Sequence, residues 1–443
     1  MKTNKLIVFF LFLAGLPFYS YAQDDDEYDI EVDGIYYKYD LNTMEASVCK
    51  PPYEVTYTGA ISIPATISRG RYTFEVTKVE QGGLSGQNMT SVTFLTEGDK
   101  GVKTIEKNGI AFCWYLEEVT LPPTLTDLGE SAFCQDVELT TVNIPDGVKE
   151  LKKNTFSDCK KLQFISLPDS MDAGGIGERC FSKTGLTSIT IPKGVRLTKK
   201  YAFVDCEDLV SVTLPDDFYG IQTGMFSGCQ SLESINFPPS LYAIMYEAFD
   251  YCKFTSFTVP PSVQLFVWDA ICSCYHIKDL VFEDDPESIN IAETEFNSNQ
   301  LTTVENLYWG RNFEGVEDNQ VFKGLKNLTI GKYVTSLPYT FGDNIEKIKC
   351  NFEDPSAVSE KFNSKVKANA TLIVPKGTYD KFCSAKGWKD FFFIEEEGES
   401  GVIDMQHVSS NWNTYYSLDG QLIVGKPTKK GVYIIGNKKM VVR

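Results

Sequence analysis

A repeat of about 23 residues constrains this chain more than any other feature. Six positions recur 23 residues apart, first as Phe203, Cys206, Leu209, Val212, Leu214 and Pro215, then as Phe226, Cys229, Leu232, Ile235, Phe237 and Pro238. A fixed period of this length is typical of a solenoid, whose units pack only against their neighbours. Because such a core grows in one dimension, 443 residues fit one elongated body.

Each unit ends in a strand and a proline. The prolines are spaced 22 to 24 residues apart, at Pro122, Pro145, Pro168, Pro192, Pro215, Pro238 and Pro260. Before each lies a pair of the type Val119-x-Leu121, whose two apolar side chains share one face of a strand. Proline lacks an N–H group, so it ends the strand and begins a turn. The pattern predicts leucine-rich coils stacked into a parallel β-sheet, mainly β with short helical turns.

Two further columns of residues are expected inside the solenoid. One is aromatic and consists of Phe112, Phe133, Phe156, Phe181, Phe203, Phe226 and Phe249. The other is made of cysteine and follows the aromatic position by three residues, at Cys159, Cys206, Cys229, Cys252 and Cys274. A periodic cysteine acts as a small apolar residue that fills one place per coil. Disulfides are common in exported proteins, so the redox state of these thiols stays open.

The ends of the chain depart from the repeat. Residues 1–22 have a short basic region, an apolar run and the small-x-small sequence Ser20-Tyr21-Ala22, which predicts a secretory signal peptide. Residues 23–75 alternate Tyr, Val and Ile and predict short antiparallel strands that cap the solenoid. The solenoid is expected over 76–394, including a C-terminal helical cap with an aromatic face. A linker at 395–401 and a small β module at 402–443 follow.

Composition limits the partners. The net charge of −18 argues against nucleic acid, which needs a basic surface, and against binding to anionic lipid. No segment after the signal peptide is apolar enough to span a membrane, so we expect an exported monomer with no membrane insertion.

The sequence offers no set of catalytic or metal-binding residues. A nucleophilic cysteine needs a histidine partner, and the chain has only His276 and His407. Cys274 and His276 are near neighbours in sequence, whereas catalytic pairs meet in space. Two histidines and cysteines spaced near 23 residues do not match a zinc site. The carboxylate clusters, such as Glu283-Asp284-Asp285, are read as solvated surface, with weak calcium binding as the alternative. We therefore predict no enzyme activity, no cofactor and no metal.

The candidate binding surface lies between the core positions. The residue between the two apolar positions of each strand points outward and forms a polar ladder of Thr120, Asn143, Ser166, Thr190, Thr213, Asn236 and Thr258. Aromatic residues interrupt polar positions on neighbouring coils, at Phe164, Tyr219, Tyr242, Tyr246, Tyr251 and Phe266. Solvation explains the ladder as well as binding does, and core packing explains the aromatics equally well.

The unit LTKKYAFVDCEDLVSVTLP at 197–215 resembles the BspA-like leucine-rich repeat family. The resemblance covers about 76–375 and also the closing segment NATLIVPKGTYDKFCSAKGWKDF. It implies a secreted or surface protein of a Gram-negative bacterium, with the periplasm as an alternative location. It also implies adhesion, in which a host extracellular protein or glycan is bound. Residues 402–443 resemble a shortened type IX sorting domain. The competing hypothesis is an envelope scaffold whose solenoid only spaces this C-terminal module.

Overall fold

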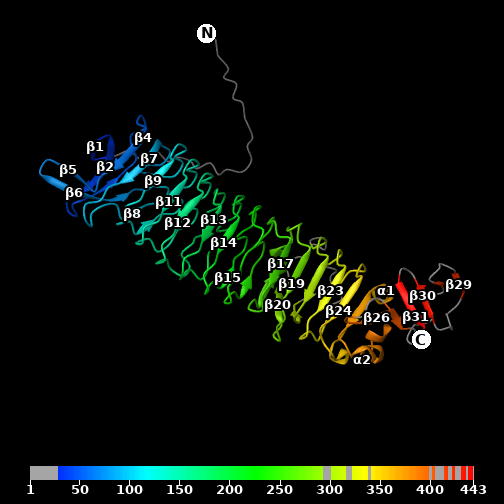
Figure 1. The fold of residues 1–443 in the computed structure, drawn as a ribbon. Helices are drawn as coiled ribbons and strands as arrows, with labels where there is room; N and C mark the ends of the chain where they lie inside the picture. Colours follow the sequence, from blue (N-terminus) through cyan, green and yellow to red (C-terminus); the bar gives the residue numbers. More distant parts are fainter. Residues whose placement is uncertain are drawn as a thin grey trace, which may run out of the picture.

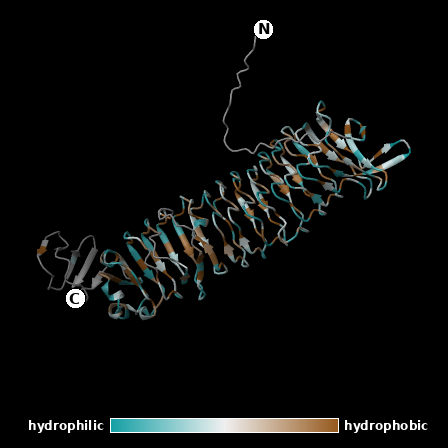
Figure 2. Cartoon of the chain, turned by 180° about the vertical axis from the view of Figure 1, so that it is seen from behind, coloured by the Kyte–Doolittle hydropathy of each residue, from teal (hydrophilic) through white to brown (hydrophobic). Residues whose placement is uncertain are grey.

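A computed structural model describes residues 28–292, 301–315, 322–337 and 341–398, together with strand segments at 402–404, 414–417, 422–424, 431–435 and 438–442. The predicted signal peptide, 1–22, lies outside the described residues. The coils follow one another in sequence order along an elongated body (Figure 1). Hydrophobic residues recur in the strands along its whole length (Figure 2). The predicted repeat solenoid is confirmed.

One side of the solenoid carries the predicted parallel sheet, here called the main ladder. Its short strands have one buried residue between two exposed ones, as at Glu118, Val119 and Thr120. Each following proline accepts a turn hydrogen bond, as from Leu125 N–H to the Pro122 carbonyl at 3.0 Å. The strands are β4 (Thr58–Ile63), β7 (Asn88–Phe94), β9 (Glu118–Thr120), β11 (Thr141–Asn143), β12 (Phe164–Ser166), β13 (Ser188–Thr190), β14 (Ser211–Thr213), β17 (Ser256–Val259), β19 (Asp279–Phe282), β21 (Asn306–Trp309), β23 (Asn327–Ile330), β24 (Lys347–Cys350), β25 (Thr371–Val374) and β26 (Phe393–Glu396).

A second parallel ladder runs along another side of the coils, and the sequence did not predict it. Its middle part consists of single bridges, such as Leu151 with Ile176 and Leu197 with Gly220. Stretches of two or three residues are too short to show the alternation that reveals a strand. The strands are β8 (Thr104–Ile105), β10 (Asp127–Leu128), β15 (Gly220–Ile221), β16 (Ala243–Ile244), β18 (Leu265–Val267), β20 (Ile289–Ala292) and β22 (Phe313–Glu314).

The aromatic column is present between the ladders. Phe156 and Phe181 stack with centroids 5.8 Å apart and ring planes 2° apart, and Phe181 and Phe203 with centroids 5.2 Å apart. Such offset parallel contacts add to the gain from burying the rings. The assignment of Phe112 to this column was wrong, because Phe112 is 36% exposed. Ile110 takes the place, since its N–H donates to the Ala132 carbonyl just as Phe133 N–H donates to that of Thr155.

Two left-handed residues four positions apart shape the turn around this column. They occur as Asn108 and Phe112 (φ 54° and 63°), and again as Asn154 and Asp158 (φ 55° and 62°). Glycine replaces both in one coil, at Gly224 and Gly228. A positive φ directs each side chain away from the core position between them, which explains why Phe112 faces solvent.

The cysteine column is a packing element. Cys159, Cys206 and Cys229 are fully buried, and all twelve cysteines are free thiols. Each column thiol donates to a carbonyl of the preceding coil, as Cys206 Sγ does to Phe181 O at 2.9 Å. Burial raises the pKa of Cys206 to about 11. The thiol thus fills a small apolar place and also satisfies a buried acceptor.

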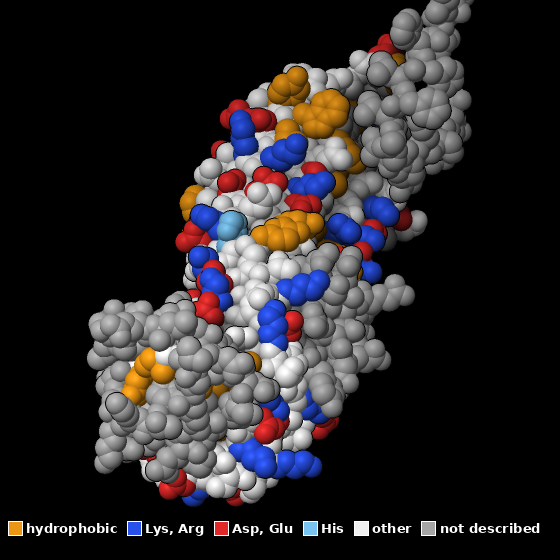
Figure 3. Space-filling model, turned by 90° about the vertical axis from the view of Figure 1, so that its right-hand side faces the viewer, with side chains coloured by type: hydrophobic (Ala, Val, Ile, Leu, Met, Phe, Trp, Pro, Cys, Tyr) orange, Lys and Arg blue, Asp and Glu red, His pale blue; other side chains and the backbone are white. Residues whose placement is uncertain are grey.

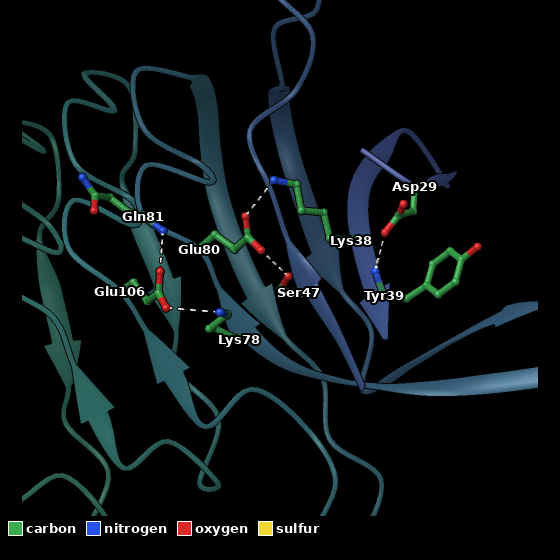
Figure 4. Close-up of polar contacts among 8 residues, drawn as sticks. All are labelled: Asp29, Lys38, Tyr39, Ser47, Lys78, Glu80, Gln81 and Glu106. Atoms are coloured by element: carbon green, nitrogen blue, oxygen red, sulfur yellow. Dashed lines mark hydrogen bonds and ion pairs between the residues drawn. The ribbon is translucent and has the colours of Figure 1, made fainter. Parts of the chain in front are cut away.

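The N-terminal segment extends both ladders with a mixture of strand directions. β1 (Ile30–Val32), β2 (Ile35–Asp40) and β3 (Glu45–Val48) are antiparallel, and β5 (Thr66–Arg69) is antiparallel to β6 (Tyr72–Val79). The sequence predicted antiparallel strands here but not the parallel pairings of β3 with β6 and of β4 with β7. Figure 4 shows polar contacts that join this segment to the coils. Glu80 accepts from Ser47 Oγ at 2.6 Å and lies 3.6 Å from Lys38 Nζ.

Short helices and a separate sheet close the chain. Trp388 is fully buried, and its ring centroid lies 5.6 Å from that of Phe382. Strand β26 includes Glu395 and Glu396 of the predicted linker, because they pair in parallel with Ile373 and Val374 of β25. The helices are η1 (Trp268–Ala270), η2 (Pro355–Ala357), α1 (Ser364–Asn369), α2 (Tyr379–Ser384) and η3 (Trp388–Asp390). The described strands after residue 401 form one five-stranded sheet: β27 (Val402–Asp404), β28 (Thr414–Ser417), β29 (Leu422–Val424), β30 (Gly431–Ile435) and β31 (Lys438–Val442).

Candidate functional site

The predicted polar ladder lies on the outer face of the main ladder. All seven of its members are exposed: Thr120, Asn143, Ser166, Thr190, Thr213, Asn236 and Thr258. Asn143 pairs with Ser166, and Thr190 pairs with Thr213, across adjacent strands. Asn236 lies in a segment without regular strand pairing. The ladder is therefore a polar surface that runs across adjacent strands.

The aromatic candidates are divided between two surfaces. Phe164 is 58% exposed and lies on the same face of β12 as Ser166. Tyr219 and Tyr242 lie beside the second ladder, with their rings stacked 5.1 Å apart and 6° from parallel. Tyr246 lies at the other edge of β16, and the nearby Glu247 carboxylate raises its pKa to about 12. The structure thus brings the tyrosines together but separates them from the polar ladder.

Sequence reasoning misplaced one aromatic residue and missed others. Phe266 is fully buried in β18, where it contacts Trp268 and Phe282 edge-on. Trp114, Tyr115 and Tyr275 are more than half exposed. They precede the main-ladder strand in their coils. In the coil of Trp114 and Tyr115, the preceding turn contains Asn108 and Phe112, both with a left-handed backbone conformation.

Charged side chains cover much of the surface in pairs between coils. Lys326 Nζ lies 2.8 Å from Glu305 Oε2, and Lys253 Nζ lies 2.7 Å from Glu233 Oε1. Figure 3 shows Lys and Arg interspersed with Asp and Glu on one face, with hydrophobic side chains between them. Exposed pairs of this kind each contribute little to stability, so they mainly solvate the surface.

The geometry around Cys274 does not form a catalytic pair. The thiol is buried and donates to the Phe249 carbonyl at 2.9 Å, whereas His276 is exposed. His276 lines a shallow hollow of about 450 Å³ together with Thr255, Tyr275, Lys278 and Glu305. Burial raises the pKa of the Cys274 thiol, so the thiolate needed for attack is disfavoured.

Three buried carboxylates are the most unusual polar groups. Asp136 is fully buried; burial raises its pKa, which the N–H of Cys113 partly opposes. Asp250 accepts from Ser273 Oγ at 3.0 Å, and burial raises its pKa and that of nearby Asp269.

Among the residues that the structure describes, no three His, Cys, Asp or Glu side chains are grouped as a metal site would require. No described helix is both long and apolar enough to cross a membrane.

The fold is that of a leucine-rich repeat solenoid. Its coils of about 23 residues form one main parallel ladder and enclose an interior of Leu, Phe and Cys. A family model described as "BspA type Leucine rich repeat region" matches six copies over residues 77–210 and 197–329. These ranges include more than half of the chain, which belongs to this BspA-type leucine-rich repeat family.

Several solved structures are similar to this chain. A leucine-rich repeat protein from Bacteroides ovatus is 20% identical, with a TM-score of 0.50 over 83% of this chain and 100% of that one. The pneumococcal vaccine antigen PcpA is 16% identical, with a TM-score of 0.46 over 84% and 98%. A leucine-rich cell surface protein from Faecalibacterium prausnitzii is 20% identical, with a TM-score of 0.42 over 86% and 97%. No curated protein matches the chain.

Proposed function

We propose that this chain is a secreted or surface-displayed binding protein of the adhesin type, without enzyme activity. It would recognise a host extracellular protein or glycan through exposed residues of the solenoid. The observation that carries the proposal is the separation of roles within each coil. Phe, Cys and Leu are buried and specify the stack, while Thr, Asn and Tyr at intervening positions remain exposed. Solenoids commonly use such extended surfaces for recognition.

Two further features support a binding role. Trp and Tyr are enriched at binding hot spots, and several are half exposed here, among them Trp114 and Tyr251. The one thiol near a histidine in sequence is turned into the core. The role of the C-terminal module as a remnant sorting domain, and the location outside the cell, belong to the same proposal.

Binding of the mature chain to a panel of immobilised matrix proteins and glycans tests this function. We expect saturable binding to at least one member of the panel. Substitution of exposed residues should weaken that binding without changing the circular dichroism spectrum. If no member binds above a matched acidic control protein, the adhesin proposal is wrong.

A further inference from the structure

Charge is segregated along the solenoid. Residues 149–200 contain eleven Lys and Arg against five Asp and Glu, a net charge of +6, whereas the whole chain has −18. The next fifty residues, 201–250, contain eight Asp and Glu and no Lys or Arg. A basic region on an acidic protein can attract an acidic ligand. Where the side chains of these cations lie on the surface therefore decides whether they form one binding site.

Four of the side chains form one row beside the second ladder. Arg196 N–H donates to the Ala173 carbonyl, Tyr219 N–H to that of Arg196, and Tyr242 N–H to that of Tyr219, at 2.8 to 2.9 Å. The Lys149 carbonyl begins the row by accepting from Asp172. Lys149, Arg196, Tyr219 and Tyr242 are all exposed. The coil between Lys149 and Arg196 contributes exposed Asp172, and beyond Arg196 the row continues with two stacked aromatic rings.

A parallel row lies on the second ladder itself. Gly177 N–H donates to the Leu151 carbonyl, and Lys199 N–H to that of Ile176, which aligns Lys152, Gly177 and Lys199. The middle coil reads Gly174-Gly175-Ile176-Gly177, and Ile176 is fully buried. Residues 174–177 therefore have no outward side chain. Lys199 Nζ lies 3.9 Å from the position that a Cβ atom would occupy if Gly174 had a side chain. The ammonium group therefore lies close to this glycine backbone.

The cations of these rows are only partly neutralised. Lys152 pairs with Asp127, and Arg196 lies 3.7 Å from Asp217, both at exposed positions where such pairs are weak. Lys149 and Lys199 form no ion pair with any described residue. The acids near these cations include Asp127, Glu150, Asp172, Glu178 and Asp217, and Glu178 is shared between Lys153 and Lys200. Positions 219–223 and 242–246 contain no charged residue.

We infer that this surface, the basic–aromatic strip of Lys149, Lys152, Arg196, Lys199, Tyr219 and Tyr242, binds a linear acidic polysaccharide. The inference rests on the proposed binding function and names its ligand class. Carboxylate or sulfate groups of the polymer contact the ammonium and guanidinium groups. The sugar rings follow the bare backbone of 174–177 and reach the tyrosines. Five coils at roughly 4.8 Å give a strip of about 19 Å, long enough for several sugar units.

The shape of the strip favours a polysaccharide over an acidic peptide. Protein partners are usually anchored by side chains that enter well-packed pockets. Two shallow hollows of the described surface lie elsewhere, around Tyr275 and around Lys347. The strip offers instead a flat glycine backbone, hydroxyl-bearing rings and separated cations. These groups suit a polymer that is polar along its whole length.

The test measures binding of the mature chain to heparin, polygalacturonate, neutral dextran and polyglutamate at physiological salt. The chain should bind the two acidic polysaccharides, more weakly as salt is raised, and should not bind dextran. The double variant Lys149→Glu/Lys199→Glu should lose about tenfold in affinity or more. Tyr219→Ala/Tyr242→Ala should also weaken binding at unchanged net charge.

The matched control is Lys160→Glu/Lys183→Glu, which changes net charge equally on two coils that the strip crosses. Both lysines are exposed but lie outside the second ladder. Equal losses in the two double variants, or equal binding of polyglutamate, would overturn the inference. So would an absence of binding to either acidic polysaccharide. If the chain then still bound another matrix ligand, the proposed adhesin function would stand, whereas failure of the whole panel would refute both.

Discussion

Replacing Asp136 by Asn should stabilise the protein at neutral pH. Asp136 occupies the place that cysteine fills in most coils, between Cys113 and Cys159, and it is fully buried. Its Oδ1 accepts from Cys113 N at 2.8 Å, and Oδ2 has no partner. Asn keeps the acceptor and removes the charge. A buried charge costs more than a buried neutral amide in the same place, so we expect a gain in unfolding free energy of about 1–3 kcal/mol.

The gain should depend on pH in a defined direction. Burial raises the folded-state pKa of Asp136 above its unfolded value near 3.9. A carboxyl whose pKa is raised by folding contributes most stability in acid, and that stability is lost as pH rises from the unfolded pKa toward the folded one. The variant should therefore be little different from the wild type at pH 3.5 and more stable at pH 7.

Urea denaturation at both pH values measures this effect. Asp208→Asn is the control, because Asp208 is exposed in another coil of the solenoid. It should change stability by less than about 0.5 kcal/mol. A destabilised D136N protein at pH 7, or an equal effect at both pH values, would refute the assignment of a strained buried carboxylate.

Three other predictions concern the core and the ends of the chain. Phe181→Ala removes a ring stacked on both sides and should cost about 3–5 kcal/mol by urea denaturation, whereas exposed Phe164→Ala should cost almost nothing. Titration with a thiol reagent should modify at most the half-buried Cys134 and Cys383 in the native protein and all twelve cysteines after unfolding; a lower final count would reveal disulfides. Deletion of 402–443 should leave ligand binding unchanged if the solenoid is the binding element, and loss of binding would favour the scaffold hypothesis.

The sequence predicted the main ladder because several independent signals agree there. The Val-x-Leu alternation, the following proline and the 23-residue spacing all mark the same strands. At Ala111-Phe112 the local letters matched the repeat, but the left-handed residues Asn108 and Phe112 shift the core position to Ile110. The second ladder was missed because its bridges involve one to three residues per coil, with glycine or lysine between apolar positions.

The candidate surface was harder to predict than the core. Whether Tyr219 shares a face with Thr213 depends on the turn that begins at Pro215, where Phe218 N–H donates to the Pro215 carbonyl. Because of that turn, Tyr219 lies beside the second ladder and not on the main ladder. The spacing of residues in the sequence does not reveal this change of face. Similarly, the cations of 149–200 are visible in the sequence, but only the backbone register aligns Lys149 with Arg196.

Adhesion of particles coated with the mature chain tests the central claim most directly. Beads bearing the chain should attach to host epithelial cells and their matrix, and soluble chain should compete for the same sites with a saturable dose dependence. Attachment no stronger than that of beads coated with an unrelated acidic protein, or attachment that excess soluble chain leaves unchanged, would contradict a specific binding function for this solenoid.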